Sequence, residues 1–69
     1  MKNVKVSKKE VQEVIETLKN GDIYQNDVAG YFFRLRNGVE RIAIINGEYK
    51  FYKNLERFAT KIAQMVKAG

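Results

Sequence analysis

The sequence contains no cysteine, no histidine and no proline. Without cysteine it forms no disulfide, and without cysteine and histidine it lacks the usual zinc ligand sets. No apolar run approaches the ~20 residues of a membrane-spanning helix, and the first ten residues, MKNVKVSKKE, lack the apolar core of a signal peptide. These absences predict a cytoplasmic protein without metal or other cofactor and without a membrane partner.

Few side chains are suited to catalysis. A nucleophile would have to be one of three hydroxyls, those of Ser7, Thr17 and Thr60, and none has an evident general base. Three glutamates repeat at i, i+3 over residues 10–16, but such spacing is typical of a solvated helical face. The glycines do not form a phosphate-binding loop. We therefore expect a protein that is not an enzyme.

Charge is unevenly distributed along the 69 residues, which we take as one small domain. Residues 1–29 contain five lysines and five acidic residues, whereas residues 30–69 contain eight Lys or Arg and three Glu. The second segment therefore carries the whole net charge of +5. This asymmetry predicts a surface for an anionic partner. The alternative is that the charge serves solubility alone.

Two segments are predicted to be helices. Ser7 and Glu10 have the spacing of a capping box, and Gly21 suits a left-handed C-cap, so the first helix spans about residues 8–20. Its apolar stripe follows i, i+3, i+4, i+7: Val11, Val14, Ile15 and Leu18. Asn54 is a plausible N-cap for a second helix that ends near Lys67. Its broad apolar face contains Leu55, Phe58, Ala59, Ile62, Ala63 and Val66.

The stretch between the helices, Gly30 to Tyr52, contains two Asn-Gly dipeptides flanked by strand-like residues. Asn-Gly favours two-residue type I′ turns because both positions need positive φ. The stretch therefore predicts a three-stranded antiparallel meander. Residues 22–29 are expected to form a loop, and whether residues 2–6 form a short strand is undecided from the sequence. The expected class is α+β, in the order α-β-β-β-α, with both helices packed on one face of the sheet.

Two-residue turns also predict the register and the two faces of the sheet. The inward face would contain Tyr31, Phe33, Leu35, Ile42, Ile44, Tyr49 and Phe51. The outward face would contain Phe32, Arg34, Arg36, Val39, Arg41, Ala43, Ile45, Glu48, Lys50 and Tyr52. In this register Arg34 stands directly opposite Arg41, and like charges across a pair repel. An anionic partner would relieve that repulsion; solvent screening is the alternative.

The outward face is the candidate binding site for DNA or RNA. Its cations can neutralise backbone phosphates, its arginines can reach guanine edges, and its aromatic rings can stack on exposed bases. The candidate residues are Phe32, Arg34, Arg36, Arg41, Lys50 and Tyr52.

Two family resemblances accompany this hypothesis. The α-β-β-β-α order resembles the double-stranded-RNA-binding domain, which implies RNA contact by the first helix and by the start of the second, where Lys53, Arg57 and Lys61 lie. Residues 30–67 are similar to the arm-binding domains of phage integrases, which implies that the open sheet face enters a DNA major groove.

The alternative function is protein interaction. The predicted outward face is rich in apolar side chains for a free surface, and open strand edges can pair with a partner. The partner would be an acidic or nucleic-acid-binding protein, as for a phage-type, anti-CRISPR-like inhibitor, or a second copy in a homodimer.

Overall fold

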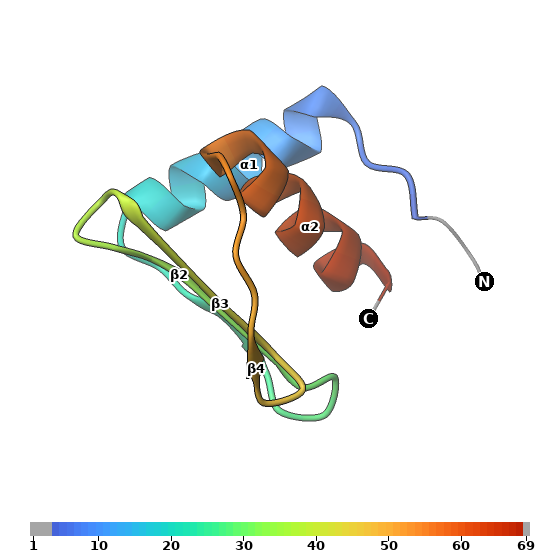
Figure 1. The fold of residues 1–69 in the computed structure, drawn as a ribbon. Coiled ribbons are helices and arrows are strands. Elements are labelled where there is room, and N and C mark those ends of the chain that lie inside the picture. Colours follow the sequence, from blue (N-terminus) through green and yellow to red (C-terminus); the bar gives the residue numbers. More distant parts are fainter. Residues whose placement is uncertain (1–3, 69) are drawn as a thin grey trace.

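The computed structural model describes residues 4–68 and contains two helices and a four-stranded antiparallel sheet with strand order β1-β2-β3-β4. Both helices lie on the same side of the sheet (Figure 1). The elements are α1 (Lys8–Lys19), β1 (Tyr24–Asn26), β2 (Tyr31–Arg36), β3 (Glu40–Ile45), β4 (Glu48–Tyr49) and α2 (Leu55–Ala68). The α+β class is confirmed, but the predicted number of three strands is wrong.

Helix α1 begins with the predicted capping box. The Ser7 amide donates to Oε1 of Glu10 at 2.8 Å, and the Glu10 amide donates to Oγ of Ser7 at 3.1 Å. The two bonds satisfy backbone donors that the first turn leaves free. Residues 4–6, which precede this cap, form no strand, and the rest of the possible strand at residues 2–6 lies outside the described residues.

Helix α2 begins after Asn54, as predicted. Oδ1 of Asn54 accepts the amide hydrogen of Arg57 at 2.8 Å. Four residues of the predicted apolar face, Phe58, Ala59, Ile62 and Ala63, are buried. An N-cap and a continuous apolar face are both local features, and for this reason the segment is recognisable from sequence.

Strand β1 is the element that the sequence pattern does not reveal. It is three residues long and pairs with the start of β2, where Tyr24 stands opposite Phe33. A tight turn joins the two strands: Oδ1 of Asn26 accepts the amide hydrogens of Val28 and Ala29, each at 3.0 Å. The prediction of a loop over residues 22–29 is wrong here, because three residues are too few to show an alternating pattern.

The register between β2 and β3 differs by one residue from the prediction. Asn37 and Gly38 have the positive φ values expected for a type I′ turn, 55° and 75°. Val39, however, stands outside the ladder, and Arg36 is paired with Glu40. Arg34 consequently faces Ile42 rather than Arg41, so the predicted repulsion between two arginines is absent.

Packing beneath the helices provides the physical reason for this shift. The Phe33 and Phe58 rings meet edge to face with centroids 6.0 Å apart, and Ala43, opposite Phe33, is fully buried. The predicted register would place the larger Ile42 at the position opposite Phe33. Overfilling a close-packed core costs about 1–3 kcal/mol, so the small side chain is favoured there.

The shift reverses the two faces of β3. The buried apolar residues are Val14, Leu18, Tyr31, Phe33, Leu35, Ala43, Phe58, Ala59, Ile62 and Ala63. Tyr31, Phe33 and Leu35 were correctly predicted to face inward. Ile44, Tyr49 and Phe51, also predicted to face inward, are exposed, and Ile42 is only half-buried. The second hairpin has its predicted register over β4, with Ile44 opposite Tyr49 and Ile45 opposite Glu48.

Candidate functional site

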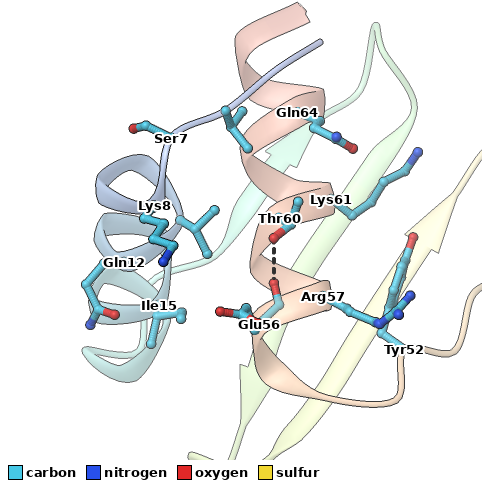
Figure 2. A pocket seen from close by; sticks show the side chains of 12 residues that line it. Ser7, Lys8, Gln12, Ile15, Tyr52, Glu56, Arg57, Thr60, Lys61 and Gln64 are labelled. Carbon is cyan, nitrogen blue, oxygen red and sulfur yellow. Dashed lines mark hydrogen bonds between the residues drawn. The ribbon is translucent and has the colours of Figure 1, made fainter. Parts of the chain in front are cut away.

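A groove with a volume of about 610 Å³ runs over the outer surface of the two helices. Figure 2 shows side chains of α1 on one side of it, side chains of α2 in the middle, and Tyr52 on the far side of α2. We call this surface the helical groove. Its residues are Val6, Ser7, Lys8, Val11, Gln12, Ile15, Tyr52, Glu56, Arg57, Thr60, Lys61 and Gln64. Its lining thus combines apolar side chains that pack on the core with polar and cationic ones.

The three cations of the helical groove are Lys8 on α1 and Arg57 and Lys61 on α2. Three ion pairs occur within residues 4–68, and none of them includes these side chains. Arg57 and Lys61 are four residues apart, so they lie on the same flank of α2. The cations of the groove therefore keep their charge available to an external anion.

One acidic residue, Glu56, lines the same groove. It lies in the first turn of α2, where the helix dipole favours a negative charge. Its carbonyl oxygen accepts the hydroxyl hydrogen of Thr60 at 2.8 Å, so that hydroxyl is already engaged (Figure 2). Three cations against one carboxylate leave the helical groove with a net positive charge.

The acidic residues of α1 do not line the helical groove, but Oε2 of Glu16 accepts a hydrogen bond from Nε2 of the groove residue Gln12 at 3.4 Å. Glu10, Glu13 and Glu16 line a second hollow, together with Lys67 from the end of α2. Lys67 donates from Nζ to Oε1 of Glu10 at 3.3 Å and to the carbonyl oxygen of Lys5 at 3.0 Å. Residues 1–29 have no net charge, but on α1 the two signs are separated: Lys8 lines the helical groove, and the three carboxylates line the second hollow.

The capping box and the ion pair perturb one of those carboxylates. The backbone N–H of Ser7, and after it the ammonium of Lys67, hold the pKa of Glu10 below its ordinary value. Both donors favour the charged form. Glu10 therefore links the start of α1 to the end of α2.

Tyr52 forms part of the groove lining and also packs on the core. Its ring lies 5.9 Å from that of Phe58, centroid to centroid. Burial raises the pKa of the Tyr52 phenol above its ordinary value of 10.0, at which a tyrosine hydroxyl is already protonated and a hydrogen-bond donor at neutral pH. The predicted register places this residue on the opposite side of the sheet, and the structure corrects that placement.

The structure does not bring the six predicted site residues together. Phe32, Arg34 and Arg36 share the outer face of β2, where Arg36 donates from Nη2 to Oε1 of Glu40 at 2.6 Å. Arg41 faces the helix side, since it is paired with buried Leu35. The other two predicted residues, Lys50 and Tyr52, lie beyond β4.

The last three predicted residues take part in internal contacts. Arg41 donates from Nε to the carbonyl oxygen of Tyr52 at 3.0 Å. Lys50 pairs with Glu48 at 3.0 Å. The Arg41 contact connects β3 to the chain that leads into α2, and the Tyr52 ring packs on Phe58, so both residues contribute to the fold. The Lys50–Glu48 pair is local and exposed.

The sheet pattern does not predict the groove residues Lys8, Gln12 and Gln64. The resemblance to the double-stranded-RNA-binding domain does imply a binding role for Arg57 and Lys61. Each helix does show a local pattern for its side of the groove: Lys8 and Gln12 on α1, and Arg57 and Lys61 on α2, are spaced i, i+4 and therefore share a helix face. The groove nevertheless depends on α1 and α2 packing side by side, which no local pattern reveals.

Comparison with protein-family models, curated proteins and solved structures finds no match to this chain. Within residues 4–68, neither helix is long and apolar enough to cross a membrane. The fold and the groove together define a small α+β domain with a helix-backed sheet and a cationic surface on its helices.

Proposed function

We propose that the protein is a non-catalytic nucleic-acid-binding domain that binds the phosphate backbone in the helical groove. The observation that carries the proposal is a set of three cations from both helices, Lys8, Arg57 and Lys61, which form no ion pair within the described part of the chain. Lysine and arginine that neutralise phosphates release condensed counterions, which is the main source of affinity for a nucleic-acid strand.

Neighbouring groups support the same ligand. The amides of Gln12 and Gln64 line the groove and can donate hydrogen bonds to phosphate, sugar or base edges, Gln12 through the N–H that is not directed at Glu16. The Tyr52 hydroxyl is a further donor. Glu10, Glu13 and Glu16 line the second hollow and not the groove, so less negative charge faces a phosphate in the groove than the neutral charge count of residues 1–29 suggests.

The helical groove carries this function better than the outer face of the sheet. Of the four cations predicted on that face, Arg34 and Arg36 remain, and Arg36 is paired with Glu40. Readout of a DNA major groove by the sheet would require the arginines and Lys50 on one surface. We therefore locate binding on the helices.

A salt series tests the proposal. Fluorescently labelled single-stranded and duplex DNA and RNA would be titrated with the protein from about 50 mM to about 200 mM salt. Three phosphate contacts give a slope of log K against log[salt] of about −2 to −3, which is a loss of roughly 20- to 40-fold in affinity over that range. Absence of binding to all four ligands at the lowest salt would refute the proposal.

Matched variants separate the groove from net charge. Arg57→Gln with Lys61→Gln removes two groove cations and should weaken binding and lower the salt slope by about 1.5–2. The control, Lys9→Gln with Lys19→Gln, removes the same charge from exposed positions outside the groove. Equal losses in the two proteins would mean that binding follows net charge and not the groove.

Polyglutamate distinguishes nucleic acid from an acidic protein partner. It is anionic but has neither phosphates nor bases. If it binds as tightly as the best oligonucleotide, and the groove variants weaken it equally, the ligand is an acidic protein surface and the nucleic-acid proposal is wrong.

A further inference from the structure

The outer face of the sheet contains a continuous apolar row. The register places Phe32 of β2, Ile44 of β3 and Tyr49 of β4 side by side across three strands. Tyr49 is 59% exposed and Phe51, just beyond β4, is 73% exposed. Both helices lie on the opposite side (Figure 1), so within residues 4–68 no helix covers this row. An exposed apolar patch of this kind marks an interaction surface.

The polar groups on the same face are self-complementary. Both hydrogen bonds that Arg36 donates to Glu40 go to Oε1 of the carboxylate. Within residues 4–68, Oε2 of Glu40 accepts no hydrogen bond, and Arg34 takes part in no ion pair. An open acceptor and an open cation thus lie on one face, and a two-fold axis would let each one of a protomer meet the other on the second protomer.

Charge also favours a second copy on this surface. The molecule carries +5, so two copies repel each other through most approaches. The outer face holds Arg34 and the internally neutral Arg36–Glu40 pair, and its centre is uncharged. It is therefore the surface on which two like-charged copies can approach with little repulsion.

The edges of the sheet are less suited to association than its face. β1 has three residues and β4 has two, so each offers few free backbone groups to an added strand. A face of four strands, about 4.8 Å apart and up to six residues long, covers roughly 20 by 20 Å. Two such faces bury at most roughly 800 Å² in total, below the about 1,200 Å² of stable specific complexes, which corresponds to a weak, transient dimer.

We infer that the protein forms a two-fold homodimer by packing the outer faces of two sheets together. In this dimer Arg34 of one protomer pairs with Oε2 of Glu40 of the other next to the two-fold axis, and Phe32, Ile44, Tyr49 and Phe51 supply the apolar contacts beside it. This inference does not depend on nucleic-acid binding, because the dimer leaves both helical grooves exposed.

The oligomeric state tests the inference directly. Sedimentation equilibrium from about 10 µM to about 500 µM covers the range of a weak dimer and should show the mass rising from 8.0 kDa toward twice that value. Ile44→Lys should remain a folded monomer throughout, as judged by circular dichroism. Val66→Lys is the control, because Val66 is exposed to a similar extent (43% against 37%) but lies on α2. A wild-type monomer at all concentrations, or a dimer unaffected by Ile44→Lys, would overturn the inference.

A charge exchange tests the symmetry of the contact. Arg34→Glu alone sets two carboxylates against each other across the interface, and Glu40→Arg alone sets two guanidinium groups together, so each variant should be monomeric. In a mixture of the two variants, the contacts join opposite charges, so the 1:1 heterodimer should form. If the mixture remains monomeric while the wild type dimerises, the proposed pairing is wrong. This test also holds if Ile44→Lys fails to fold.

Discussion

Arg41 is tied to Tyr52: its Nε donates to the Tyr52 carbonyl oxygen at 3.0 Å, and its Nη2 reaches the carbonyl oxygen of Lys53 at 3.4 Å. The guanidinium thereby joins the central hairpin to the chain that leads into α2. From the sequence, this arginine was expected to contact a partner. In the structure its charge is directed at backbone acceptors of its own chain.

The first prediction follows from this contact. Arg41→Ala should lower the free energy of unfolding by about 1–3 kcal/mol, since hydrogen bonds to charged groups are among the stronger ones and the carbonyl groups lose their donor. Arg34→Ala, on the outer face, should change it by less than about 0.5 kcal/mol. Urea denaturation of the two variants measures the difference. Equal effects would indicate that Arg41 is not structural.

The second prediction concerns Val39, which stands outside the ladder and is 72% exposed. Deleting it leaves Asn37 and Gly38 as a two-residue loop between Arg36 and Glu40, which is a favoured hairpin geometry. The pairs of β2 with β3 are then unchanged, so the free energy of unfolding should shift by less than about 1 kcal/mol.

The register prediction from sequence requires the opposite result for that deletion. If Arg36 were paired with Val39, removing Val39 would turn every side chain of β3 to the other face. The protein would then lose its core packing and unfold. Circular dichroism and a thermal melt of the deletion variant distinguish the two registers.

The third prediction uses two glycines with positive φ. A Cβ on Gly30 would lie 2.6 Å from Oδ1 of Asn46, whereas a Cβ on Gly21 would meet no atom within 4 Å. Both alanine variants incur the cost of a left-handed conformation, about 1–2 kcal/mol. Gly30→Ala should cost more, because the Asn46 side chain must also move. Chemical denaturation gives both values, and a smaller loss for Gly30→Ala would contradict the close approach of Asn46.

The fourth prediction concerns acid stability. The pKa of Glu10 is lowered in the folded protein, mainly by the Ser7 amide and to a lesser extent by Lys67. Its carboxylate therefore stabilises the fold fully at pH values above 4.5, the ordinary pKa of the group. That stabilisation is lost as the pH falls through the folded pKa. The melting temperature of the wild type should therefore exceed that of Glu10→Gln at pH 7, and the difference should vanish in acid.

A second variant separates the contribution of the Ser7 amide to this acid-dependent stability from that of Lys67. Lys67→Gln removes the ammonium but leaves the Ser7 amide in place. It should reduce the pH-dependent stabilisation without abolishing it, because the amide is the larger cause of the pKa shift. A complete loss of pH dependence in Lys67→Gln would mean that the ion pair, and not the capping box, holds Glu10 charged.

Several elements were predictable from neighbouring residues. The capping box of Ser7 and Glu10 and the N-cap at Asn54 were found where their local spacing indicated. The turn at Asn46-Gly47 has φ values of 52° and 80°, as a type I′ turn requires. These features depend on hydrogen bonds and dihedral angles within a few residues, so a short stretch of sequence contains all the information they need.

The register of β3 and the helical groove depended on contacts between distant segments. The turn at Asn37-Gly38 is compatible with either Val39 or Glu40 opposite Arg36, and packing favours the second because buried Ala43 then lies opposite Phe33, whose ring meets that of Phe58. This register places Ile44 on the outer face of the sheet, away from the helices. Likewise, Lys8 and Lys61 are 53 positions apart in the sequence and share a surface because α1 packs beside α2. Local propensity is nearly indifferent to a one-residue shift, whereas a close-packed core is not.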